Sequence, residues 1–184
     1  VMTAERDGCL SHGIFRVPGY LASLKSGYVD GAAVPVIRQD RPGTVTVDGR
    51  GGFAQVAREA ARDRLLEAVR RQGIACLTIR NAHHYAALAP DIEPFAEAGL
   101  VAFSCVNGRS RVAPWGARRA VIGTNPLAFA CPRAGAAPLM WDMATSAIAN
   151  GDILLAARDG HVIPEGVALD AAGAPTTAPR AVLQ

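Results

Sequence analysis

The segment FAQVAREAARDRLLEAVRRQ (53–72) constrains the fold more than any other part of the sequence. Its apolar residues recur at helical spacing and are expected to share one side of a helix. They are Phe53, Val56, Ala60, Leu65 and Val69. The segment ends on arginines and is followed by Gly73, a pattern typical of a helix C-terminus. The sequence therefore predicts a long amphipathic helix over 53–72.

Strand and helix patterns surround this helix. Apolar or alternating runs bounded by turn residues predict strands, and longer periodic stretches predict helices. The predicted strands are 44–47, 74–79, 100–107, 127–132 and 137–144, the last two as a hairpin; the predicted helices are a short one near Pro18, one within 81–99 and one over 145–157. A Pro/Gly-rich stretch at 31–52 predicts a connector between two lobes. The fold class is therefore mixed α/β, divided at 50/51.

Composition excludes several classes of protein. The chain has 184 residues, of which 50% are hydrophobic and 19% charged, so it is expected to bury a core. No apolar stretch is long enough to span a bilayer, and the four cysteines form no C-x-x-C pair, so we expect a soluble cytoplasmic protein with reduced thiols. The arginines are scattered, and Lys25 is the only lysine, which argues against nucleic-acid binding.

Two familiar nucleotide-binding motifs are missing. The sequence contains neither G-x-G-x-x-G nor G-x-x-x-x-G-K-[ST]. A Rossmann domain and a P-loop are therefore not expected, and candidate sites must be sought among histidines, arginines and carboxylates.

The first candidate site is Ser11-His12-Gly13 with Arg16 four residues after the histidine. An arginine can bind a carboxylate through two hydrogen bonds, and a histidine can deliver a proton near neutral pH. Together they would hold and protonate a small carboxylate-bearing substrate. The alternative is an exposed turn in which Ser11 caps a helix.

The second candidate site is Asn81-Ala82-His83-His84-Tyr85, between a predicted strand and a predicted helix. The positive end of a helix at such a junction suits a phosphate or pyrophosphate. Adjacent histidines lack the i, i+4 spacing of H-E-x-x-H, so we predict no metal site. The remaining alternative is two histidines that only pack or meet solvent.

The third candidate is Asp152, which shares a helical stripe with Ile148 and Leu155. A carboxylate on an inward face needs a partner, and His12 is the natural one. If the helix is instead broken at Gly151, Asp152 meets solvent. A serine hydrolase is disfavoured because no G-x-S-x-G elbow is present.

Four blocks together resemble the type-2 malate/L-lactate dehydrogenase family. They are LSHGIFRVPGYLASLKSG, RNAHHYAALAPDIEPFAEAGLVAFSCVN, GTNPLAFACPR and DMATSAIANGDI. Within the family, the blocks are most similar to members that reduce cyclic imino acids. The resemblance implies NADPH-dependent reduction of Δ1-piperideine-2-carboxylate to L-pipecolate and of Δ1-pyrroline-2-carboxylate to L-proline, with NADH as the alternative cofactor, by a homodimer.

The resemblance also implies a fold and a set of roles. It implies a non-Rossmann cofactor domain with a largely antiparallel sheet flanked by helices at 51–184, and part of a substrate and catalytic lobe at 1–50. The implied catalytic residues are Ser11, His12 and Asp152, with His12 as proton donor. The implied substrate contacts are Arg16 and Thr124. The implied cofactor contacts are His84, Tyr85, Ala86, Ala87, Leu88, Asp142, Met143 and Ala144.

Two other interpretations stay open. One is a 2-hydroxyacid dehydrogenase of the same family that acts on malate, lactate, ureidoglycolate or sulfolactate, because such substrates carry the same carboxylate. The other is a truncated, inactive relative, because family members begin earlier and extend further, and the chain is therefore expected to be incomplete.

Overall fold

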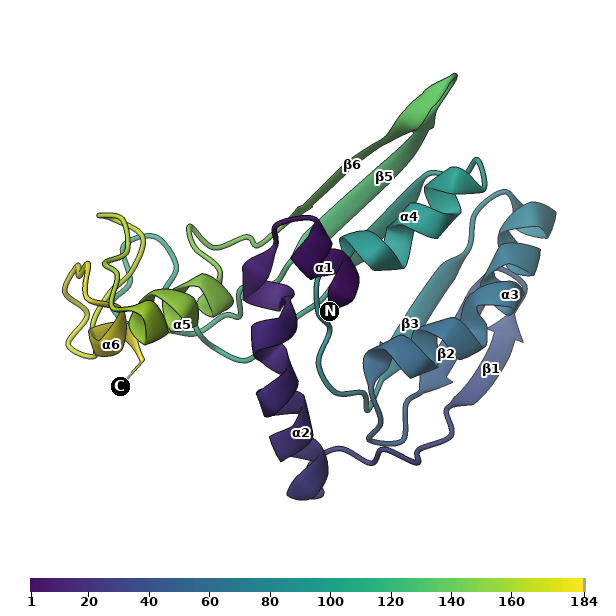
Figure 1. The fold of residues 1–184 in the computed structure, drawn as a ribbon. Helices are drawn as coiled ribbons and strands as arrows, with labels where there is room; N and C mark the ends of the chain where they lie inside the picture. Colours follow the sequence, from purple (N-terminus) through teal and green to yellow (C-terminus); the bar gives the residue numbers. More distant parts are fainter. Residues whose placement is uncertain (184) are drawn as a thin grey trace. The chain divides into compact units, whose positions relative to one another are not determined.

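The computed structural model describes residues 1–183 and divides into two compact units (Figure 1). Unit 1 combines Val1–Arg16 with the chain from Ala87 onward, and unit 2 is Val17–Ala86. Their boundaries differ from the division predicted at 50/51, because the connector 31–52 supplies two strands to the same unit as the long helix. The substrate and cofactor roles assigned to 1–50 and 51–184 stay predictions.

Unit 2 is a three-stranded sheet covered on one face by a helix. Its elements are α2 (Val17–Lys25), β1 (Val36–Arg41), β2 (Thr44–Asp48), α3 (Ala54–Gln72) and β3 (Cys76–Arg80). The strand order is β1-β2-β3, with β1 antiparallel and β3 parallel to β2. The helix near Pro18 and the strands β2 and β3 were predicted, whereas β1 was missed because Pro/Gly content suggested only a connector.

The long helix α3 confirms the clearest sequence prediction, but it packs through other residues than expected. It ends at Gly73, which adopts the left-handed conformation with φ of 77°. Its buried side chains are all alanines: Ala54, Ala57, Ala61 and Ala68. Small side chains let the helix approach Val45 and Val47 of β2 closely. The predicted apolar face was therefore wrong, and Val56 is exposed.

Unit 1 holds the second sheet and most of the helices. Its elements are α1 (Met2–Arg6), the 3-10 helices η1 (Leu10–His12) and η2 (Ile14–Arg16), α4 (Ala89–Glu97), β4 (Ala102–Cys105), β5 (Leu127–Arg133), β6 (Ala136–Met143), α5 (Asn150–Asp159) and α6 (Pro179–Val182). The sheet has the order β4-β5-β6 and is antiparallel throughout, which confirms the predicted hairpin. Helix α4 lies along this sheet (Figure 1).

Strands β3 and β4 flank α4 in the sequence but belong to different sheets. The chain after β3 does not enter a helix at once, since it runs beside the loop that precedes α3. Gly49 N donates to Arg80 O, Gly51 N to Asn81 O, and His83 N to Gly52 O. These hydrogen bonds hold the chain from Arg80 to His83 against that loop, and α4 begins only at Ala89.

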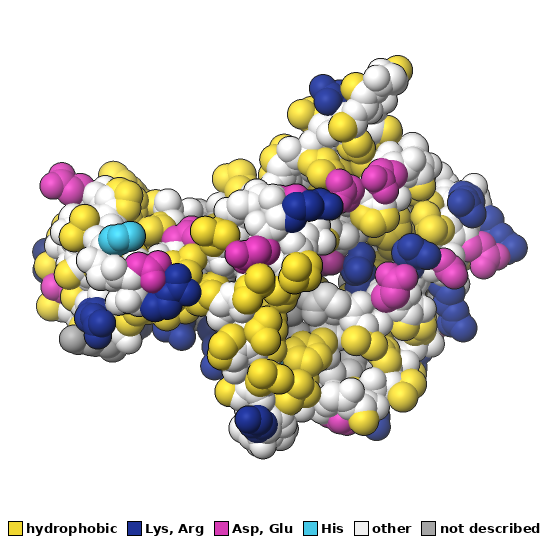
Figure 2. Space-filling model, viewed as in Figure 1, with side chains coloured by type: hydrophobic (Ala, Val, Ile, Leu, Met, Phe, Trp, Pro, Cys, Tyr) yellow, Lys and Arg dark blue, Asp and Glu magenta, His cyan; other side chains and the backbone are white. Residues whose placement is uncertain are grey.

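The surface mixes charges of both signs with scattered apolar side chains (Figure 2). Apolar atoms gather over α2, where Val17 and Leu21 are exposed. Among residues 1–183, none of the helices is both long and apolar enough to cross a bilayer.

Candidate active site

Ser11 and His12 lie on η1, in unit 1, and their side chains touch. Ser11 is buried and its Oγ lies 3.1 Å from His12 Nδ1. The Cys9 thiol lies on the same side of the ring, with Sγ 3.5 Å from Nδ1. A 3-10 turn places residues i and i+3 above one another, which explains why Cys9 meets His12. Both contacts are made at Nδ1.

Arg16 follows on η2 and folds back over the same turn. Its Nε donates to the Ser11 carbonyl at 2.8 Å, and its guanidinium lies 5.1 Å from the centre of the Phe15 ring. The arginine is therefore held in place before any substrate arrives, which reduces the entropy that binding would cost.

The start of α5 packs directly on η1. A Cβ added to Gly151 would lie 2.6 Å from Ser11 O and 3.0 Å from Arg16 Nη2, closer than real Cβ contacts allow. Only glycine therefore permits this approach. The contact brings two segments that are far apart in the sequence to one place.

The prediction that Asp152 packs inward is wrong. The helix was expected over 145–157 but begins at Asn150, so the buried residues of its first turn are Gly151 and Ile153, and Asp152 is exposed. Within residues 1–183 its carboxylate makes no hydrogen bond to His12. Its negative charge is the smallest of the effects that act on the pKa of His12, and it raises that pKa.

Four effects set the pKa of His12. Burial lowers this pKa below its ordinary value of 6.5, and the positive charge of Arg16 lowers it further. The carboxylates of Asp142 and Asp152 oppose both effects and raise the pKa. The ring is therefore partly removed from water and lies within range of two negative charges, as expected for a group that gains and loses a proton.

Asp142, at the end of β6, is hydrogen-bonded to the start of α4. Its Oδ2 accepts from Leu88 N at 2.6 Å and from Ala89 N at 2.8 Å. Two predicted cofactor residues, Leu88 and Asp142, are thus brought together. The same bonds correct the prediction of a phosphate site at this helix N-terminus, because a carboxylate already takes its free N–H groups and would repel an anion.

Thr124 lies beside the segment that follows β6. Its carbonyl accepts from both the backbone N and the Oγ1 of Thr145, each at 2.9 Å. Next to Thr145, Ala144 is partly buried and Met143 is 55% exposed, whereas Leu88 is fully buried. The predicted substrate contact and one predicted cofactor segment therefore share one region of unit 1.

The predicted cofactor contacts from His84 to Ala86 belong to unit 2. His84 has its own partners there: the Tyr20 hydroxyl lies 3.1 Å from its Nδ1, and Gln55 Nε2 donates to its carbonyl. Tyr85, Ala86 and Ala87 are partly buried, with the unit boundary between the two alanines. The structure thus gives His84 a clear packing role within unit 2.

Sequence reasoning missed the role of Glu5. Its Oε2 accepts from Ile14 N at 2.8 Å, and the carboxylate lies against Gly13, where an added Cβ would displace it. Glu5 therefore braces the turn that joins His12 to Arg16. No motif signals this contact, because the two residues are joined by folding of α1 onto the turn.

Throughout residues 1–183, no group of three or more His, Cys, Asp or Glu side chains could hold a metal ion.

Comparisons with known proteins identify the family of the chain. A sequence model described as malate/L-lactate dehydrogenase matches residues 1–184. A Delta(1)-pyrroline-2-carboxylate/Delta(1)-piperideine-2-carboxylate reductase of Pseudomonas syringae pv. tomato is 56% identical over 98% of this chain and 53% of its own length. A reductase of the same description from Pseudomonas putida is 55% identical over 99% of this chain and 53% of its own length.

A solved structure shows the same likeness in three dimensions. The crystal structure of delta1-piperideine-2-carboxylate reductase from Pseudomonas syringae matches with a TM-score of 0.94 at 56% identity, over 98% of this chain and 55% of that one. The chain spans about half the length of the relatives that it matches. Its mixed α/β fold with small sheets is the fold found in that structure. The chain belongs to the malate/L-lactate dehydrogenase family.

Proposed function

We propose that the protein reduces the C=N bond of small cyclic imino acids, with Δ1-piperideine-2-carboxylate and Δ1-pyrroline-2-carboxylate as substrates. The names of relatives more than half identical to this chain support the substrate class. The observation that carries the chemistry is His12, a half-buried imidazole with Arg16 on one side and the charges of Asp142 and Asp152 acting on it. This surrounding suits proton delivery to a carboxylate-bearing substrate.

In the proposed reaction, Arg16 binds the substrate carboxylate and fixes the ring. His12 then donates a proton to the ring nitrogen as the C=N π bond opens. A reduced nicotinamide, when bound, would supply the hydride for C2, so that one C–H and one N–H bond form and the products are L-pipecolate and L-proline. The Ser11 hydroxyl at Nδ1 orients the imidazole, and the charge of Asp152 stabilises its protonated form.

The proposed cofactor is NADPH, with NADH as the alternative. Asp142 occupies the N-terminus of α4, so this helix end does not suit the phosphates of the cofactor. Met143 is exposed and apolar, and therefore suits contact with a ring of the cofactor. Ala144 and the stretch His84, Tyr85, Ala86, Ala87 and Leu88 complete the proposed set. The absence of G-x-G-x-x-G supports a cofactor domain of non-Rossmann type built around β4-β5-β6.

A direct assay tests the proposal. The purified protein is mixed with NADPH and either cyclic imine, and the absorbance of the reduced nicotinamide is followed. We expect its oxidation to depend on both imine and protein. No oxidation with either imine would contradict the proposal.

Two further measurements separate the competing functions. Oxidation of malate, lactate, ureidoglycolate or sulfolactate with NAD or NADP, without activity on imines, would favour a 2-hydroxyacid dehydrogenase. Calorimetric titration with NADPH distinguishes an inert relative, for which no saturable binding is expected.

We also propose a cytoplasmic homodimer on the basis of the family resemblance. Light scattering coupled to gel filtration measures the oligomeric state.

A further inference from the structure

The open face of the sheet in unit 2 carries a cluster of charged side chains that the proposed reaction does not use. Side chains alternate between the two faces of a strand, so Val45 and Val47 of β2 pack on α3 while Thr46 and Asp48 point to the other face. The strand register places Arg38 of β1 beside Thr46, and Arg80 of β3 beside Asp48. Polar and positively charged groups therefore collect on one uncovered face.

These side chains line an open surface cavity of about 170 Å³. Its lining consists of Val36, Arg38, Thr46, Val47, Asp48, Arg50 and Arg80. Three guanidinium groups and one carboxylate thus line the same space, together with the Thr46 hydroxyl. The balance of charge around the cavity is positive.

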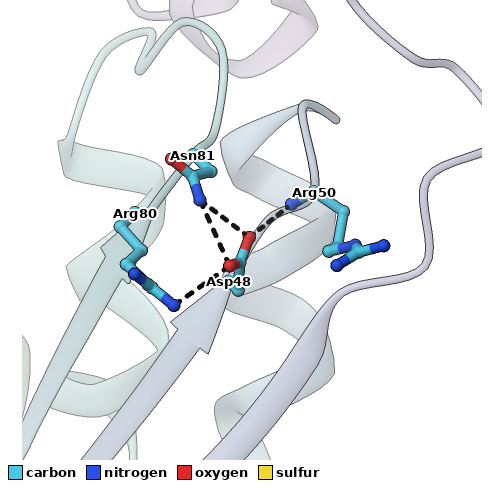
Figure 3. A network of polar contacts seen from close by, with 4 residues as sticks. All are labelled: Asp48, Arg50, Arg80 and Asn81. Atoms are coloured by element: carbon cyan, nitrogen blue, oxygen red, sulfur yellow. Dashed lines mark hydrogen bonds and ion pairs between the residues drawn. The ribbon is translucent and has the colours of Figure 1, made fainter.

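Asp48 is fully engaged by its neighbours (Figure 3). Its carboxylate accepts from Arg50 N at 3.0 Å and from Asn81 Nδ2 at 3.2 Å, and it lies 3.2 Å from Arg80 Nη2. The backbone bond from Arg50 is the largest of the effects that lower the pKa of Asp48, so the carboxylate stays ionised. Asp48 therefore balances the charge of Arg80 and fixes the loop that carries Arg50.

Arg38 and Arg50 are held less closely than Arg80, although the charge of Arg50 is among the effects that lower the pKa of Asp48. Within residues 1–183, neither guanidinium forms an ion pair with a carboxylate. Arg50 also holds a left-handed backbone conformation, with φ of 54°, which is unfavourable for a residue with a side chain. The hydrogen bonds from Gly49 and Gly51 to the end of β3 keep the loop in this form. Strained backbone conformations held by surrounding bonds cluster at binding and catalytic positions.

We propose that this cavity binds a phosphate-type oxyanion, either inorganic phosphate or a phosphate monoester, between Arg38 and Arg50. Guanidinium groups match the geometry of phosphate oxygens and form charge-assisted hydrogen bonds with them. Arg80, held by Asp48, adds positive charge from the third strand, and Val36 offers an apolar wall to the organic part of an ester. This site lies wholly in unit 2 and does not depend on the proposed reductase activity.

The experiment is a calorimetric titration of the whole protein with inorganic phosphate at constant ionic strength, with chloride as the blank. We expect saturable binding that weakens about tenfold in Arg38→Gln and in Arg50→Gln, since each removes one charge-assisted contact. Arg41→Gln is the matched control, because Arg41 also lies on β1 but outside the cavity, and binding should be unchanged. Both test residues are exposed, so circular dichroism should show native folding.

A phosphate monoester, ribose 5-phosphate, forms the second arm of the test. Tighter binding of the monoester than of phosphate, lost in the same two variants, indicates that an ester is the ligand, and equal binding indicates inorganic phosphate. Absence of saturable binding by both probes overturns the proposal. So does equal weakening in all three variants, because that result indicates an effect of net charge and no defined site.

Discussion

The two histidine environments of this protein differ in what surrounds the ring. In unit 1, His12 touches a hydroxyl and a thiol, and the charges of Arg16, Asp142 and Asp152 act on it. In unit 2, His84 receives the Tyr20 hydroxyl at Nδ1, and its ring meets the Tyr20 ring edge-on at 5.0 Å between centroids. One imidazole lies among charges, and the other among aromatic rings.

This difference identifies His12 as the imidazole on which charges are shown to act. Charges of both signs near His12 make its pKa sensitive to each neighbour. The ring of His84 belongs to an aromatic cluster with Tyr20 and Phe53 that joins α2 to the loop before α3. Histidine pairs and single histidines look alike in a sequence, and only their surroundings distinguish the two roles.

The largest effect is expected from His12→Ala. If His12 is the proton donor, turnover of the cyclic imine should fall at least about a hundredfold, as for other acid-base groups. Steady-state kinetics measures the loss. His161→Ala is the matched control, because His161 is exposed beyond the end of α5, and its rate should be unchanged. Comparable rates in the two variants would remove His12 from the mechanism.

Gly151→Ala tests the contact between α5 and η1. The added methyl group would collide with Ser11 and Arg16, so the helix must shift. We expect a loss of about 1–3 kcal/mol in the free energy of unfolding, typical of overpacking, together with reduced turnover. Urea denaturation measures the first quantity. Gly19→Ala, also in a helix but with open space around it, should not destabilise the protein. A stable Gly151→Ala variant would show that the contact is looser than described.

The pH dependence of imine reduction tests the charges around His12. Since the protonated ring is the donor, the rate should fall as pH rises through the pKa of His12, which burial places below 6.5. Asp152→Asn removes one effect that raises this pKa, so the fall should move to lower pH. NMR titration of the His12 ring measures the pKa without any substrate. An unchanged titration in Asp152→Asn would show that Asp152 does not act on the imidazole.

The smallest effect is expected in unit 2. Tyr20→Phe removes the hydroxyl that reaches His84 Nδ1 and keeps the aromatic contact with Phe53. The loss should be about 1 kcal/mol in the free energy of unfolding, the usual contribution of one hydrogen bond, with no change in the pKa of His12. Thermal denaturation and the NMR titration above provide both values. A shift in the His12 titration would refute the separation of the two environments.

Local features of the fold could be predicted from the sequence because they depend on neighbouring residues. Gly73 ends α3 because glycine readily adopts positive φ, and alternating apolar residues around the Gly135 turn produce the β5–β6 hairpin. The Ser11-His12 pair and Arg16 could be chosen for the same reason, since their chemistry is visible within one short stretch.

Contacts between distant segments were decided only by the tertiary structure. Periodicity predicted an inward Asp152, but the approach of α5 to Ser11 requires Gly151 at that place and leaves Asp152 exposed. Asp142 reached the start of α4, and Glu5 the turn after His12, through packing that no local pattern encodes. The sequence by itself determined which groups could do chemistry. Their neighbours, and hence their protonation, depend on burial and charge, which exist only once the chain has folded.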